Sequence, residues 1–170
     1  MKVFITAQSG VGKTTVTDEL VRRGYTAFDT DNVPGMARLE LRETGQPVEW
    51  PVSGYIDWKK YGWNIQGGVL DEVLSRGETV FLSGICGNQD EFYSKFDKLV
   101  VLTVEHDEYL RRMRTRPHRG ASDEEINIQQ RIGKYATKLQ QFIDSGFVTV
   151  DNSGAVEQTV DQILSIVYEK

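Results

Sequence analysis

The chain has 170 residues, of which 39% are hydrophobic, and this is enough to form the core of one compact domain. Its formal net charge of −5 argues against nucleic acid as the main partner. No apolar run is long enough to span a bilayer, no signal-peptide pattern is visible, and the single cysteine cannot form an internal disulfide. We therefore expect a cytoplasmic protein that works without a membrane, as a monomer or a homodimer.

A glycine-rich turn follows the first apolar run, Val3-Phe4-Ile5, which predicts a strand. After the turn we predict a helix from Lys13 to about Arg23. A glycine-rich turn between a strand and a helix is the context that a phosphate-binding (Walker A) loop requires. Gly10 and Gly12 allow successive backbone N–H groups to curl round an anion, and the helix directs its free N–H groups at the same phosphates.

Two side chains of this turn have predicted roles. Lys13 would reach the β- and γ-phosphates, and the Thr14 hydroxyl would ligate Mg²⁺. Ala7 stands where the first glycine of the motif normally lies, and alanine is the smallest replacement. We therefore expect the chain to bind ATP with Mg²⁺, through Gln8, Ser9, Gly10, Val11, Gly12, Lys13, Thr14 and Thr15.

Strands and helices alternate along the rest of the chain. Four more short strands, apolar or β-branched, are predicted at 25–28, 79–82, 99–102 and 147–150. Helices are predicted from Asn32 to about Gly45, and over 57–75, 90–96, 105–116, 122–146 and 155–168. This alternation predicts a single α/β domain, residues 1–170, in which helices cover both faces of a five-stranded parallel sheet in three layers.

All three tryptophans lie between residues 50 and 63. One face of the helix predicted over 57–75 would carry Trp58, Tyr61, Ile65, Val69 and Val73. The aromatic side chains have two possible roles. They pack that helix onto the sheet, or one or two of them line a pocket for a ring.

Two aspartates follow the second predicted strand, in Asp29-Thr30-Asp31. Ligands of such sheets bind beyond the carboxyl ends of the strands. Asp29 is the best carboxylate to hold the metal with Thr14, because the third strand ends in Ser83 rather than aspartate. Asp31 could serve a substrate hydroxyl as a base, or it could cap the helix predicted after it.

Basic residues are concentrated in one stretch that holds Arg111, Arg112, Arg114, Arg116 and Arg119. Phosphoryl transfer spreads negative charge over the γ-phosphate oxygens, which positioned arginines stabilise. Arg116 and Arg119, with Arg131 on the next helix, bracket a predicted lid at about 116–123. Arg112 and Arg116 are candidate contacts to ATP, whereas a solvated cationic face explains Arg111 and Arg114.

Several of these motifs resemble those of the small P-loop kinases that phosphorylate nucleotides or small metabolites. Four of them are similar to shikimate kinase: Gly10 to Thr15, Phe28 to Asp31, Arg116-Pro117, and Arg131 with Tyr135. In that family the first aspartate lies near the metal and the second contacts substrate. The arginine before proline belongs to the lid, and the last arginine grips the substrate acid. The family's triple-glycine turn corresponds to Ser83-Gly84-Ile85-Cys86-Gly87, and no matching arginine motif occurs in 45–65.

The part from the lid to the C-terminus also resembles adenylate kinases, in 123–135 and in Asp151-Asn152-Ser153-Gly154. In those enzymes the turn after the fifth strand touches adenine, which implies Gly154 and Ala155 here. Arg38 lies where adenylate kinases place an arginine on the acceptor's phosphate. The resemblance implies the sheet order 2-3-1-4-5 and an acceptor-binding region at about 32–66.

These observations favour an ATP-dependent kinase that transfers the γ-phosphoryl group to a nucleoside monophosphate or a similar nucleotide. A small polyol or acid is the alternative acceptor, and a nucleotide-hydrolysing regulatory switch is the alternative from another class, since fold does not fix function. The residues with predicted catalytic roles are Lys13, Asp29, Asp31, Arg116 and Arg131. The predicted substrate contacts are Asp31, Arg38, Gly84 and Arg131.

Overall fold

The computed structural model describes residues 1–51, 56–115 and 125–168, with 125–131 as backbone only. Its central sheet has five parallel strands, in the order β2-β5-β1-β6-β7. Their bounds are β1 (Lys2–Thr6), β2 (Ala27–Asp29), β5 (Val80–Ser83), β6 (Lys98–Thr103) and β7 (Val148–Asp151). Counted among themselves, these strands have the order 2-3-1-4-5, so the predicted fold class and strand order are confirmed.

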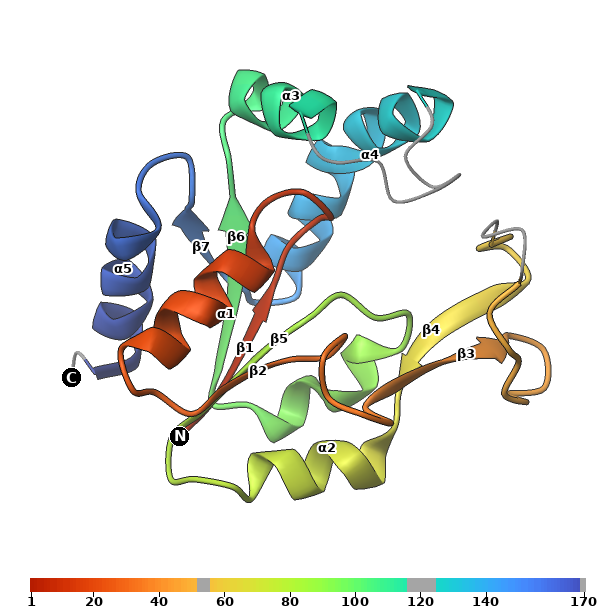
Figure 1. Cartoon of the computed structure of the whole chain (residues 1–170), viewed down its shortest axis with the longest axis horizontal. Helices are drawn as coiled ribbons and strands as arrows, with labels where there is room; N and C mark the ends of the chain where they lie inside the picture. Colours follow the sequence, from red (N-terminus) through yellow and green to blue (C-terminus); the bar gives the residue numbers. More distant parts are fainter. Residues whose placement is uncertain (52–55, 116–124, 169–170) are drawn as a thin grey trace.

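The helices cover both faces of this sheet (Figure 1). One hydrophobic core contains side chains of α1 (Lys13–Arg22), α3 (His106–Thr115) and α5 (Val156–Tyr168). A second core contains side chains of α2 (Gly67–Leu74) and of the 3₁₀ helix η1 (Gln89–Lys95). The long α4 (Glu125–Asp144) contributes to both. Within the described residues, no helix is long and apolar enough to cross a membrane.

β1 shows why the sheet is buried on both faces. Val3 and Ile5 belong to the first core, and Phe4, between them, belongs to the second. Alternate side chains of a strand point to opposite faces, so a strand covered by helices on both sides is apolar at every position. The loop that leaves β1 is therefore held at the carboxyl edge of a rigid strand.

A two-stranded antiparallel hairpin replaces one predicted helix and the first part of another. β3 (Ala37–Leu41) pairs with β4 (Tyr61–Ile65), and the hairpin projects from the body of the domain (Figure 1). The helix predicted from Asn32 is wrong: the chain turns there, and Gly35 has a φ of +74°, a value that glycine tolerates and other residues avoid. Only 67–74 of the helix predicted over 57–75 is helical, because Gly67 and Gly68 begin α2 instead of interrupting a longer helix.

Candidate active site

The loop between β1 and α1 has the backbone shape of an anion cradle. Gly10 and Gly12 have φ values of +92° and +112°, in the left-handed region. A Cβ at Gly10 would lie 2.6 Å from Met113 Sδ, and a Cβ at Gly12 would lie 2.5 Å from Asn152 Nδ2. Conformation and lack of space therefore both require glycine at these two positions, as the motif predicts.

α1 begins directly after this cradle, at Lys13. Its first N–H groups and the positive end of its dipole therefore face the space that the loop encloses. Lys13 is partly buried, and its ammonium donates to Ala7 O at 2.9 Å, across the loop. One turn after Lys13 on α1, Thr17 Oγ1 and Ser83 Oγ share a 2.6 Å hydrogen bond, which fixes the helix to the end of β5.

The residues predicted to hold the metal are in direct contact. Thr14 Oγ1 donates to Asp29 Oδ2 at 2.9 Å. Asp29 is the last residue of β2 and is buried, and its Oδ1 accepts from Asp31 N at 3.0 Å. One carboxylate and one hydroxyl suit Mg²⁺, which takes oxygen ligands and usually retains several waters.

A cavity of about 660 Å³ joins these parts. It brings together both predicted metal ligands, most of the predicted phosphate-binding loop and, of the predicted acceptor contacts, Asp31. Its lining consists of Ser9, Gly10, Gly12, Lys13, Thr14, Thr15, Asp29, Asp31, Asn32, Arg112, Thr115 and Asn152. The other predicted contacts to ATP that the structure describes do not line it: Val11 is buried, Gln8 is partly buried, and Gly154 and Ala155 are exposed before α5.

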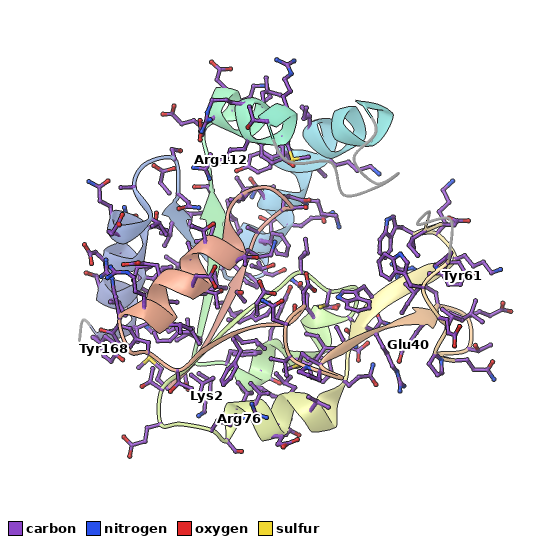
Figure 2. The ribbon with its side chains drawn as sticks, in the orientation of Figure 1. Lys2, Glu40, Tyr61, Arg76, Arg112 and Tyr168 are labelled. Atoms are coloured by element: carbon purple, nitrogen blue, oxygen red, sulfur yellow. The ribbon has the colours of Figure 1, made fainter. Side chains whose placement is uncertain are left out.

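Arg112 of α3 reaches across to the phosphate-binding loop (Figure 2). Its guanidinium donates to Val11 O at 2.8 Å and to Asn152 O at 2.7 Å. Asn152, after β7, donates from Nδ2 to the same Val11 O at 2.7 Å, and its Oδ1 accepts from Thr159 Oγ1. Asn152 belongs to a segment, Asp151-Asn152, that was expected beyond the carboxyl end of the last strand, where ligands bind, but no role was predicted for its side chain.

Arg112 is itself held by Glu108, one turn earlier in α3. Its Nε donates to Glu108 Oε1 at 2.7 Å, and Arg111 donates to both oxygens of the same carboxylate. Hydrogen bonds from Arg111 and then Arg112 lower the pKa of Glu108 to about 2. The carboxylate therefore stays charged and keeps Arg112 directed at the loop.

Protonation of Glu108 is expected to weaken this network in acid. Its pKa in the folded protein is below the value of about 4.3 of an unfolded chain, so it adds stability that is complete above about pH 4.3 and is lost as the pH falls toward 2. Glu108→Gln should lower the free energy of unfolding at pH 7 but not near pH 2, as measured by urea denaturation. Glu72→Gln is the control, because its carboxylate lies 3.9 Å from Arg76. If the free energy of unfolding depended on pH in the same way in the wild type and in Glu108→Gln, this role of Glu108 would be contradicted.

Asp31 lines the cavity and is exposed. Its Oδ1 accepts a hydrogen bond from the indole Nε1 of Trp63 on β4, at 3.1 Å. The alternative role of Asp31 as the cap of a following helix is wrong, because the next element is β3. Trp63 lies on a strand rather than on the helix predicted over 57–75, and it packs against the second core.

Arg38 lies on β3 rather than on a helix. Its Nε donates to Glu40 Oε1 at 2.6 Å, while half of the side chain remains exposed. Glu40 and Tyr61 mark the two strands of the hairpin in Figure 2. The contact between Arg38 and an acceptor's phosphate stays a prediction, and it would require the bond to Glu40 to be shared or released.

Gly84, directly after β5, lies close to Thr30, between the two aspartates in the chain. A Cβ there would lie 2.5 Å from Thr30 Cγ2, and Thr30 is buried. Gly84→Ala should therefore destabilise the protein by about 1–3 kcal/mol, through overpacking. Gly68→Ala is the matched control: no atom lies within 4 Å of its Cβ, so it should stabilise α2 by up to about 1 kcal/mol. Urea denaturation measures both, and equal effects of the two substitutions would contradict the tight contact at Gly84.

A family model described as an AAA domain matches residues 3–132, which include the loop, both aspartates and the hairpin. The chain belongs to the AAA domain family. No curated protein matches it closely enough to count as a relative.

Solved structures show which fold this AAA domain shares. Shikimate kinase from Bacteroides thetaiotaomicron is 19% identical, with a TM-score of 0.61 over 98% of both chains. Shikimate kinase from Acinetobacter baumannii, in complex with shikimate, is 21% identical, with a TM-score of 0.61 over 98% of this chain and 92% of that one. Deoxyadenosine kinase from M. mycoides, with bound dATP, is 16% identical, with a TM-score of 0.57 over 98% of this chain and 99% of that one. The AAA domain therefore has the fold of the small P-loop kinases.

Two predicted arginines of the AAA domain cannot be placed against this cavity. Arg116 and the lid predicted at 116–123 lie outside the described residues. Arg131 lies on α4, and the description of that part covers the backbone only. Both residues stay predictions, as do the roles of Arg38, Gly84, Gly154 and Ala155.

Proposed function

We propose that the chain is an ATP-dependent small-molecule kinase, with a nucleoside monophosphate or a similar nucleotide as the acceptor. The observation that carries this proposal is the 2.9 Å bond between Thr14 and Asp29 at the start of α1. Around it, one cavity contains a lysine, a glycine cradle and a second carboxylate. These are the parts that phosphoryl transfer needs, because its catalysis consists of positioning and charge stabilisation.

The phosphates of ATP would bind to the backbone around Gly10 and Gly12, with Lys13 beside them. Thr14 and Asp29 would hold Mg²⁺, and their oxygen atoms fit the preference of this ion. When bound, the metal would neutralise negative charge on the phosphates. Glu108 and Arg112 keep the loop in its binding conformation by fixing Val11 O.

Asp31 is the group that would meet the acceptor. Its carboxylate is exposed and lies two residues beyond the carboxylate of Asp29. In the transfer, an acceptor oxygen forms a bond to the γ-phosphorus as the bond from phosphorus to the β–γ bridging oxygen breaks, and ADP leaves. If the acceptor oxygen is a hydroxyl, its proton passes to Asp31. Arg116 and Arg131 are proposed to stabilise the charge on the transferred group.

A small polyol or acid is the second candidate acceptor. The exposed carboxylate of Asp31 suits a hydroxyl, and one structure of the same fold is a shikimate kinase in complex with shikimate. A regulatory switch that hydrolyses ATP is the alternative outside the kinases. A cytoplasmic location and a monomeric or homodimeric state remain predictions from the sequence.

An acceptor screen with coupled detection of ADP release tests the proposal. A kinase should release ADP slowly when no acceptor is present and much faster when one class of acceptor is added. The screen should contain nucleoside monophosphates, nucleosides, shikimate and simple polyols. A slow rate that no acceptor changes would contradict the kinase proposal and favour the switch.

A further inference from the structure

The three tryptophans form one cluster beside the hairpin, which we call the tryptophan platform (Trp50, Trp58 and Trp63). The ring centroids of Trp50 and Trp63 are 5.9 Å apart, and those of Trp50 and Trp58 are 6.5 Å apart, both in edge-to-face contact. Trp50 is 53% exposed and Trp58 is 52% exposed. Large apolar side chains that gather on a surface in this way commonly mark a binding site.

The platform is joined to the candidate active site by a hydrogen bond. Trp63 Nε1 donates to Asp31 Oδ1 at 3.1 Å. Asp31 lines the same cavity as Lys13, Thr14 and Asp29. The Asp31 carboxylate, which is proposed to meet the acceptor, therefore lies next to the platform. A molecule bound on the platform could place a polar group beside this carboxylate.

The part of the platform on β4 is also held in a fixed place relative to the central sheet. Gly87 N, in the loop after β5, donates to Trp63 O at 2.7 Å. The side chain of Asn88 accepts from Ile65 N at 2.8 Å and donates to Ile65 O at 3.1 Å. Trp63, fixed in this way, loses little conformational freedom on binding, which favours affinity.

A buried carboxylate completes this anchoring. Glu40 accepts hydrogen bonds from Asn64, Arg38 and Gln66. Burial raises the pKa of Glu40, but these hydrogen bonds outweigh burial, and the pKa lies below its usual value. Glu40 is therefore charged, and it links β3 to β4, the strand that carries Trp63.

Two arginines of the hairpin form hydrogen bonds within it. Arg38 is bonded to Glu40, and Arg42 Nε donates to the carbonyl oxygens of Trp58 and Tyr61. These two arginines therefore already have partners in the hairpin. The platform offers aromatic surface, on which planar rings stack with little dependence on their substituents.

We propose that the tryptophan platform binds the nucleobase-like ring of the phosphoryl acceptor, and that Trp63 positions Asp31 toward the acceptor's reacting group. This proposal rests on the proposed function, because it assigns the acceptor half of that reaction. It selects an acceptor with a planar heteroaromatic ring over a polyol or a simple acid. Trp63 acts here as a positioning residue for Asp31.

Intrinsic fluorescence tests the platform independently of turnover, because the chain's three tryptophans are its three members. The wild-type protein would be titrated with AMP, GMP, CMP and UMP, with ribose 5-phosphate as the matched compound without a ring. Mg²⁺ and inorganic tripolyphosphate would occupy the phosphate-binding loop without adding a ring of their own. We expect a saturable change in emission with at least one nucleotide and none with ribose 5-phosphate. Emission that none of the four nucleotides changes would overturn the platform.

Variants then connect the platform to catalysis. Trp58→Ala should raise the KM for the acceptor about tenfold with little change in the KM for ATP, and Trp58→Phe should largely restore it. Trp63→Phe keeps a ring but removes the N–H, so it should lower kcat by about tenfold. Tyr168→Ala is the control, since this side chain is 53% exposed on α5.

An unchanged acceptor KM in Trp58→Ala, or efficient transfer to a compound without a ring, would overturn the platform and leave the kinase proposal intact. Saturable nucleotide binding without any transfer would overturn the kinase proposal instead.

Discussion

Lys13→Met is expected to abolish phosphoryl transfer and to leave the protein folded. The positioned ammonium would stabilise charge on the transferred phosphoryl group, and its loss should cost about 3 kcal/mol or more in the transition state. This corresponds to a fall of at least about a hundredfold in turnover. Lys13 is partly buried, and methionine can fill the place of its aliphatic stem. Thermal unfolding and the ADP-release assay, run on the same preparation, measure both parts of the prediction.

Lys95→Met is the matched control for Lys13→Met. Lys95 forms an exposed ion pair with Asp71 on the far side of the sheet from α1, and such pairs contribute little. This control should keep both its melting temperature and its activity. Turnover of Lys13→Met within a few fold of wild type would refute the assignment of the phosphate-binding loop.

Asp29→Asn is expected to lower turnover strongly, and raised Mg²⁺ should partly restore it. Asn keeps the shape of the side chain but removes the charge, so the metal loses its best ligand beside Thr14. The rescue should be only partial, because the amide nitrogen of Asn takes the place of one carboxylate oxygen. Each of the two oxygens of Asp29 accepts a hydrogen bond, one from Thr14 and one from Asp31 N, so one of these bonds is lost. The measurement is kcat and the KM for ATP over a series of Mg²⁺ concentrations.

Asp31→Asn is the variant with which Asp29→Asn should be compared. Asp31 lies further from Thr14 along the chain and contacts Trp63. Its loss should slow transfer without rescue by Mg²⁺ and should raise the KM for the acceptor more than that for ATP. Full activity in Asp31→Asn would remove this residue from the mechanism. Rescue of both variants by Mg²⁺ would instead assign both carboxylates to the metal.

The local parts of the fold and site could be predicted from the sequence. Gly10, Gly12 and Lys13 act through backbone geometry and helix polarity, which follow from residue type and spacing. Asp29 could be placed near Thr14 because it ends a short apolar strand, and the carboxyl ends of parallel strands lie at the same edge of the sheet as the loop. The strand order came from the resemblance to P-loop kinases, since spacing alone does not fix it.

The hairpin could not be predicted because distant residues stabilise it. Leu39 pairs with Trp63, and Glu40 bonds to Asn64 across 24 residues. Local propensity and helical spacing instead favoured two helices, and tertiary pairing overrode them. Arg112 had been named as a contact to ATP, but its bond to Val11 O spans 101 residues and could not be read from any local pattern.

The bond between Asn152 and the phosphate-binding loop has a consequence for the order in which the protein folds. Asn152 Nδ2 and Val11 O are 141 residues apart in the chain, and Asn152 follows β7, at the edge of the sheet. Contacts of such long sequence separation form late, because the loop that they close must first lose its conformational entropy. A chain growing on the ribosome makes its phosphate-binding segment first and can lock it only after the last strand has been synthesised. Nucleotide binding should therefore be among the last properties that the nascent protein acquires.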